Sequence, residues 1–208
     1  MHTKKIIDLF PTPVCITNRD SDLTLKEKKH IKKIIMKGMN RNYGNSSSSN
    51  TYIFNRHLQE LKEFCEQQIK AYVEEVISPK KELDFYITQS WLNVTKPGEF
   101  HHEHSHPNSI ISGVFYVETV EDDKIMFFDP NSRVKKLIKF ELENYHTWNS
   151  ASWILPVKNN ELILFPSWLN HAVEPNEKAN ANRISISFNT FVRGTLGNQE
   201  GLTELILN

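Results

Sequence analysis

The feature that most constrains the fold is a change of pattern at Asp84. From there to about residue 193, short apolar or alternating segments are separated by turn signals such as Lys96-Pro-Gly and Lys158-Asn-Asn. Alternation with a period of two places apolar side chains on one face of a strand. Many short strands at this spacing favour an antiparallel sandwich or barrel over a parallel sheet. The predicted strands lie near 84–95, 100–106, 110–118, 124–128, 151–157, 161–165, 170–174 and 183–192.

Two helices are predicted before this region. Thr24 to Met39 begins with a capping box, Thr24 with Glu27 three residues later. Its apolar residues are predicted to lie along one face: Leu25, Ile31, Ile34 and Ile35. Asn55 to Ile77 carries a stripe at steps of three or four residues, formed by Leu58, Leu61, Cys65, Ile69, Tyr72 and Val76.

The segments that flank the first helix are predicted to be irregular. Ile6 to Ile16 is apolar but contains Pro11 and Pro13, which is typical of an edge strand or an extended arm. Residues 40–50, NRNYGNSSSSN, are predicted to form a polar loop that could border a site. We therefore expect a single domain over residues 1–208, mainly β with flanking α-helices. Helical support is expected over about 24–77 and the β core over about 84–193.

Composition excludes several classes of function. Lys+Arg and Asp+Glu both number 25, so no overall basic field would gather nucleic acid. Two cysteines without CxxC spacing favour a reducing compartment, and we expect a cytoplasmic protein. The N-terminus lacks the apolar core of a signal peptide, and no apolar run approaches the roughly 20 residues of a membrane span.

Four of the nine histidines lie within six residues, in the stretch His101-His-Glu-His-Ser-His106. In an extended strand, His102, His104 and His106 would share one face, and His101 and Glu103 the other. Two ligands at i and i+2 with a third from a distant strand would occupy one face of an octahedral metal, as in the facial triad of non-heme iron enzymes. Both His101 with Glu103 and His104 with His106 satisfy this spacing. The alternative is a surface cluster with adventitious metal affinity.

A second stretch supplies the distant histidine. His171 follows the turn Phe165-Pro-Ser-Trp-Leu-Asn, and Arg183 comes twelve residues later at the start of an alternating strand. Arg183, Ser185 and Ser187 are predicted to share one strand face. An arginine with small polar neighbours can hold a carboxylate through a bidentate pair of hydrogen bonds.

These motifs together resemble a family of 2-oxoglutarate/Fe(II)-dependent oxygenases of the prolyl-hydroxylase-like superfamily, found in bacteria and phages. The resemblance runs from about residue 9 to 192. The matching motifs are LFPTPV at 9–14, Trp91-x-Asn93, His104-x-His106-Pro107, Ser112-Gly113-Val114-x-Tyr116, Phe128-x-Pro130, Phe165-Pro166-Ser167-Trp168-x-x-His171 and Arg183-x-Ser185-x-Ser187-Phe188-Asn189.

The resemblance implies a double-stranded β-helix, or jelly-roll, core and an enzyme that uses Fe(II), 2-oxoglutarate and O2. It makes His104, His106 and His171 the metal ligands, although His106 stands where the wider superfamily has Asp. Arg183 then pairs with the distal carboxylate of 2-oxoglutarate. By weaker matches, Tyr116 also reaches that carboxylate and Asn93 also binds 2-oxoglutarate. The implied outcome is hydroxylation with release of succinate and CO2.

Two other functions fit parts of the sequence. Gly98 followed by His104-x-His106 opens a cupin metal motif, but the motif's later glutamate is missing and Trp168 replaces its glycine. A non-catalytic β-sandwich could also keep a metal for stability. The primary substrate, a protein side chain or a small metabolite, is not specified by the sequence. No role is assigned to the aromatic residues near 145–168, namely Tyr145, His146, Trp148, Trp153 and Trp168.

Overall fold

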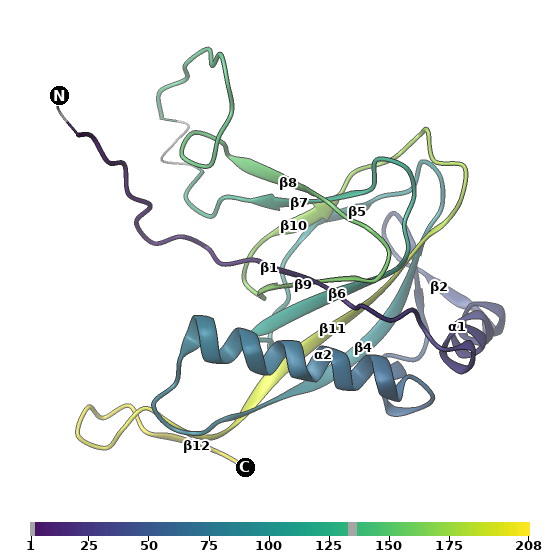
Figure 1. Cartoon of the computed structure of the whole chain (residues 1–208), viewed down its shortest axis with the longest axis horizontal. Helices are drawn as coiled ribbons and strands as arrows, with labels where there is room; N and C mark the ends of the chain where they lie inside the picture. Colours follow the sequence, from purple (N-terminus) through teal and green to yellow (C-terminus); the bar gives the residue numbers. More distant parts are fainter. Residues whose placement is uncertain (1–2, 133–136) are drawn as a thin grey trace.

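Two antiparallel sheets face each other in the computed structural model, which describes residues 3–132 and 137–208 (Figure 1). The larger sheet has the order β1-β9-β6-β11-β4-β3-β2, with β12 paired to β11, and the smaller has the order β5-β10-β7-β8. The strands of the larger sheet are β1 (Cys15–Asn18), β2 (Met39–Arg41), β3 (Ser46–Ser48), β4 (Asp84–Thr95), β6 (Ile111–Glu118), β9 (Glu161–Pro166), β11 (Arg183–Leu196) and β12 (Leu205–Leu207). Those of the smaller sheet are β5 (His101–His104), β7 (Lys124–Phe128), β8 (Ser152–Pro156) and β10 (His171–Val173). Each predicted strand after Asp84 therefore has a counterpart, within a few residues of its expected bounds.

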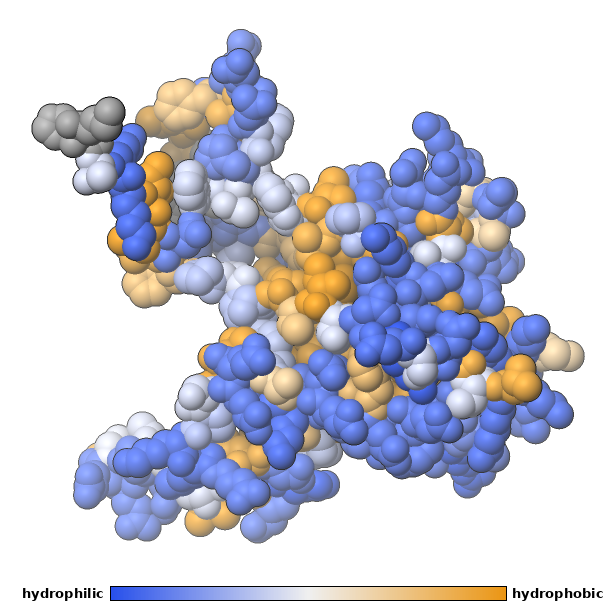
Figure 2. Space-filling view, viewed as in Figure 1, coloured by the Kyte–Doolittle hydropathy of each residue, from blue (hydrophilic) through white to orange (hydrophobic). Residues whose placement is uncertain are grey.

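The first helix, α1 (Leu25–Lys37), begins at the predicted capping box. Thr24 Oγ1 accepts the Glu27 backbone N–H, and the Glu27 carboxylate accepts the Thr24 N–H at 2.9 Å. The same carboxylate accepts the Leu61 N–H at 2.9 Å and so joins the two helices. Of the residues predicted to form its apolar face, Ile31 is buried, whereas Leu25 in the first turn is 87% exposed. The lysine-rich face is solvated, and hydrophilic residues dominate the surface over α1 in Figure 2.

The second helix, α2 (Gln59–Tyr72), lies across the outer face of the larger sheet (Figure 1). It is shorter than predicted because a 3-10 turn, η1 (Ile53–Asn55), precedes it and a π-helical turn, η2 (Val73–Ile77), follows it. The predicted stripe is buried against the sheet except for Val76, which is 42% exposed. A second core lies between the two sheets and contains Val114, Tyr116, Ile125, Phe127, Ile163 and Phe165. These two cores fix the strands that carry the site.

The segment predicted as a polar loop forms a hairpin instead. Strands β2 and β3 pair with each other, and Ser46 and Ser47 of β3 pair with β4. This hairpin is held by backbone hydrogen bonds and by Ser48 Oγ, which accepts the Leu92 N–H at 3.0 Å. Because these bonds need no apolar side chains, the hairpin can form without the apolar alternation by which a strand is recognised in sequence. Its turn approaches β5, where the Tyr43 and His102 rings lie 5.5 Å apart.

The N-terminal segment is an extended arm that ends in the edge strand β1, as predicted. Residues 129–132 and 137–150, between β7 and β8, project from the body (Figure 1). Trp148 Nε1 in this segment donates a hydrogen bond to Asp8 of the arm. In the described ranges, no helix is long and apolar enough to cross a membrane.

Candidate metal centre

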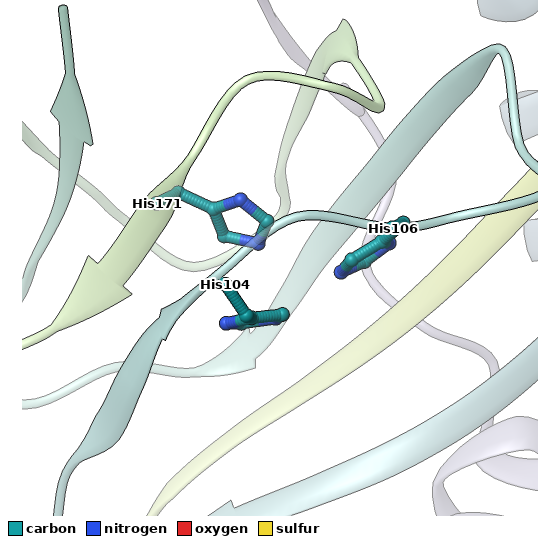
Figure 3. Close-up of side chains that lie close together, drawn as sticks. All are labelled: His104, His106 and His171. Carbon is teal, nitrogen blue, oxygen red and sulfur yellow. The ribbon is translucent and has the colours of Figure 1, made fainter. Parts of the chain in front are cut away.

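Three histidine side chains converge between the two sheets (Figure 3). His104 ends β5 and His171 begins β10, and the two are direct cross-strand partners. His106 lies just beyond β5, where its backbone N–H donates to Ser167 O at 2.8 Å. One ring nitrogen from each histidine lies within 4.8 Å of the others. Of the residues that the structure describes, these are the one group of three or more His, Cys, Asp or Glu side chains able to hold a metal.

Backbone carbonyls fix the tautomers of two of these histidines. His104 Nδ1 lies 2.8 Å from His102 O, and His171 Nδ1 lies 3.0 Å from Leu169 O. A carbonyl oxygen can only accept, so each Nδ1 carries the hydrogen. Each Nε2 then keeps its lone pair for a metal, an arrangement typical of metal-binding histidines.

His106 is fixed by side chains from the larger sheet. Its Nδ1 lies 2.6 Å from Asn189 Oδ1 on β11 and 2.9 Å from Ser112 Oγ on β6. Ser112 in turn bonds Ser167 at 2.8 Å, next to the turn that leads to β10. Donation from Nδ1 to the amide oxygen leaves His106 Nε2 free as well, so all three imidazoles can offer the same kind of lone pair.

Burial keeps these imidazoles neutral. It lowers the pKa of His171 to about 2 and that of His106 to about 4, and it also lowers the pKa of His104. Desolvation penalises the imidazolium, and the neighbouring rings add to the effect. A neutral imidazole is the form that binds a metal, so no proton has to be displaced near pH 7.

The side-chain alternation predicted for the histidine block is wrong for His101, although His104 and His106 share a side as predicted. His171 pairs with His104 and Val173 with His101, so three steps along β5 oppose two along β10. This bulge turns His101 to the same side as His104, and their rings stack at 4.3 Å. Glu103 points outward and accepts from Asn170 Nδ2 at 2.8 Å. The structure therefore brings together the His104 and His106 pairing and does not bring Glu103 to the centre.

Arg183 lies in the same hollow as the histidines, here called the histidine pocket. The pocket is continuous with solvent, and its empty volume, counted together with the open solvent at its mouth, is about 330 Å³. The residues that line it include Trp91, Asn93, His101, His104, His106, His171, Arg183, Ser185 and Ser187. Arg183 is 6% exposed, and its Nε donates to Asp123 Oδ2 at 3.0 Å. Its guanidinium carbon lies 5.0 Å from the centre of the Tyr116 ring.

Two buried polar atoms in residues near Arg183 make no hydrogen bond within the described part of the chain. Tyr116 Oη and Asn93 Oδ1 have no hydrogen-bond partner among the described residues. Asn93 Nδ2 donates to Ser187 Oγ at 2.9 Å. Because a hydroxyl both donates and accepts, the Asn93 amide can turn over and present an N–H to an anion. Burying such groups unpaired is costly, so their presence fits a pocket that takes a polar ligand.

The donor set also fits a first-row transition metal. Imidazole suits iron, and three ligands from one side leave positions for other molecules. Bonds of about 2.1 Å require ligand nitrogens closer together than 4.8 Å, so the rings must rotate slightly to close on an ion.

The aromatic residues to which no role was assigned do not line the histidine pocket. Trp148, Trp153, Trp168 and Tyr145 are 50, 42, 56 and 74% exposed. Trp91 does line it, and its ring lies 5.8 Å from that of His106.

Comparison with known proteins decides the family. Residues 89–189 match the sequence model of a family described as "Putative 2OG-Fe(II) oxygenase". This part of the chain, just under half of its residues, matches the 2OG-Fe(II) oxygenase family. The match spans β5, β10 and the start of β11, and so includes all three histidines and Arg183. Fe(II) and 2-oxoglutarate, the cofactor and co-substrate that the family name gives, are therefore those of this oxygenase.

Solved structures show the same fold as the oxygenase. A prolyl-4-hydroxylase from Pseudomonas putida is 13% identical, with a TM-score of 0.54, and the alignment covers 88% of this chain and 94% of that one. HygX from Streptomyces hygroscopicus, solved with nickel and 2-oxoglutarate, is 8% identical (TM-score 0.55; 86% and 82% covered). A Trichoplax adhaerens prolyl hydroxylase, solved with a peptide fragment, is 15% identical (0.51; 86% and 83%). No curated protein matches the sequence.

The predicted double-stranded β-helix with flanking helices is thereby confirmed. Sequence reasoning did not identify Asp123, Asn189 or Ser112 as parts of the site. The sequence did contain an indication that Asn189 faces the site, because Asn189 continues the alternation of Arg183, Ser185 and Ser187 by one more step. Asp123 had none, since the turn Glu121-Asp-Asp offers three equivalent acidic residues.

Proposed function

We propose that this chain is a 2-oxoglutarate-dependent hydroxylase in which His104, His106 and His171 hold Fe(II). The observation that carries the proposal is the shared tautomer of the three histidines, with every Nδ1 bonded to an oxygen acceptor. When bound, iron and 2-oxoglutarate supply the chemistry that puts one oxygen atom of O2 into a substrate C–H bond and the other into succinate, with release of CO2.

The pocket's own residues would bind and orient the co-substrate. Arg183 has both Nη groups free of Asp123, and a guanidinium matches a carboxylate with two parallel hydrogen bonds. Tyr116 Oη and the Asn93 amide are buried and can each give a further hydrogen bond to the ligand. Burial raises the pKa of Tyr116 to about 12, so its hydroxyl keeps the proton it would donate.

Charge supports a dianionic partner for this site. Three neutral imidazoles leave the full charge of an Fe(II) ion uncompensated, whereas a His₂-carboxylate triad removes one unit. 2-Oxoglutarate brings two negative charges into a buried site, where opposite charges interact more strongly than in water. Binding of metal and co-substrate should therefore be strongly cooperative.

The alternatives fit the pocket less well. A cupin-type enzyme that does not use 2-oxoglutarate gives no role to a buried arginine beside the metal site. A metal kept only for stability needs a closed, saturated site, whereas the histidine pocket is continuous with solvent.

Turnover of 2-oxoglutarate tests the proposal. Fe(II)-loaded protein, incubated aerobically with 2-oxoglutarate and ascorbate, should release succinate slowly even without the primary substrate. His171→Ala should release none, and Glu103→Gln, a matched change on the outward side of β5, should behave as wild type. Succinate formation that survives His171→Ala but not Glu103→Gln would overturn the ligand assignment. No succinate from the wild type would overturn the function.

A further inference from the structure

We propose that Asp123 is a positioning residue that holds the Arg183 guanidinium at the end of the histidine pocket and so sets the length of 2-oxo acid that the pocket accepts. The inference rests on the proposed function, because it concerns the co-substrate of that reaction. It assigns to Asp123 selection among 2-oxo diacids rather than contact with the ligand.

The Asp123 carboxylate is itself anchored. Oδ1 accepts the Lys124 backbone N–H at 2.9 Å, and Oδ2 accepts from Arg183 Nε at 3.0 Å. The Asp123 backbone N–H donates to Val120 O at 3.2 Å, which holds the turn between β6 and β7. With side chains only 4% and 6% exposed, the ion pair of Asp123 and Arg183 has little freedom to rearrange.

A second hollow is also lined by Arg183. Its empty volume, counted together with the open solvent at its mouth, is about 270 Å³. It is lined by Arg183 and Asp123 together with Thr95, Lys96 and Glu174. Thr95 Oγ1 is buried there and has no hydrogen-bond partner within the described part of the chain. Arg183 thus lines both hollows, and the second contains Thr95 Oγ1, a buried hydroxyl oxygen that can accept a hydrogen bond.

The bond to Asp123 decides which hollow the guanidinium serves. Asp123 accepts the hydrogen bond from Arg183 Nε. The two Nη groups of Arg183 therefore stay available for a carboxylate in the histidine pocket. Without the carboxylate of Asp123, the long arginine side chain is free to withdraw toward Thr95 and Glu174. Withdrawal of the Arg183 side chain would lengthen the histidine pocket. In Asp123→Glu, the side chain is longer by one methylene group and would push the guanidinium into the histidine pocket, which would shorten it. Asp123→Ala and Asp123→Glu should therefore shift the preferred ligand length in opposite directions.

The test measures dissociation constants of three diacids by calorimetry on Ni²⁺-loaded protein: oxaloacetate, 2-oxoglutarate and 2-oxoadipate. For Asp123→Ala, we expect affinity for 2-oxoglutarate to fall at least about tenfold, because a hydrogen bond that orients a charged group is lost. The ratio of 2-oxoadipate to 2-oxoglutarate affinity should rise by a similar factor. For Asp123→Glu, the ratio of oxaloacetate to 2-oxoglutarate affinity should rise instead.

Glu174→Ala is the matched control, since it removes a carboxylate that lines the second hollow but bonds Lys124 rather than Arg183. It should leave all three affinities near the wild-type values. Circular dichroism checks the fold of each variant, and Asp123→Glu, which keeps the charge, carries the test if Asp123→Ala does not fold. Affinities that fall equally for all three diacids, or ratios that stay unchanged, would overturn the positioning role alone. A wild type that binds no 2-oxoglutarate would overturn the proposed function with it.

Discussion

Replacing Arg183 with Met should weaken folding and co-substrate binding, and a second substitution should restore only the folding. In Arg183→Met, the aliphatic part of the side chain remains, so little packing is lost. The Asp123 carboxylate, 4% exposed, is left without its cation. Removing one partner of a buried ion pair costs about 3–5 kcal/mol of the free energy of unfolding. In the double variant Arg183→Met, Asp123→Asn, no buried charge remains, and stability should return to within about 1 kcal/mol of wild type.

Unlike stability, 2-oxoglutarate binding should not be restored by the second substitution. Each charged hydrogen bond from Arg183 to the distal carboxylate is worth about 1.5–3 kcal/mol, so loss of two should weaken 2-oxoglutarate about a hundredfold or more. Both variants should show this loss. Urea denaturation of the metal-free protein measures the first effect, and calorimetry with Ni²⁺-loaded protein measures the second. Equal stability of the single variant and wild type, or wild-type binding by the double variant, would refute the reasoning.

The same single variant should respond to pH with a defined sign. Burial already raises the pKa of Asp123, and Arg183 opposes that effect. Without the guanidinium, the folded-state pKa should rise further above the unfolded value. A folded state that binds the extra proton gains stability as pH falls through that pKa. Arg183→Met should therefore recover stability on acidification, whereas the double variant should not.

Three further predictions concern the histidines. His104→Ala should lose stoichiometric Fe(II) binding with the fold retained, as measured by metal content after desalting. Asn189→Ala removes the acceptor of His106 Nδ1–H and should weaken metal binding about 10- to 100-fold, while Asn159→Ala, remote from the site, should not. In the metal-free protein, the low pKa values of His106, about 4, and His171, about 2, mean that the unfolded chain binds more protons. The free energy of unfolding should therefore fall as pH drops below about 6.5, and a flat profile down to about pH 5 would contradict this.

Much of the β core could be predicted because its signals are local. Alternation and turn residues specify strands such as β4 and β11 without reference to the rest of the chain. The β2–β3 hairpin could not be recognised, since its backbone bonds to β4 leave no apolar pattern in residues 40–50. In the same way, the bulge in β5 is imposed by pairing with β10, and a strict period of two misplaced His101 relative to His104.

The candidate site divides along similar lines. Its histidines and Arg183 could be predicted from residue type, spacing and resemblance, because metal and carboxylate chemistry restrict the choices. Asp123 and Ser112 act through contacts between segments far apart in sequence, and only the folded arrangement brings them to Arg183 and His106. Positioning residues of this kind have no fixed spacing from the groups they support.

Anaerobic titration of the Fe(II)-loaded protein with 2-oxoglutarate tests the central claim most directly. We expect a visible charge-transfer absorbance that saturates at one equivalent, appears in Glu103→Gln and is absent from His104→Ala and His171→Ala. Arg183→Met should still bind iron and should reach the same absorbance only at about a hundredfold higher 2-oxoglutarate concentration. An iron-loaded wild type that gives no such absorbance at saturating 2-oxoglutarate would contradict the account.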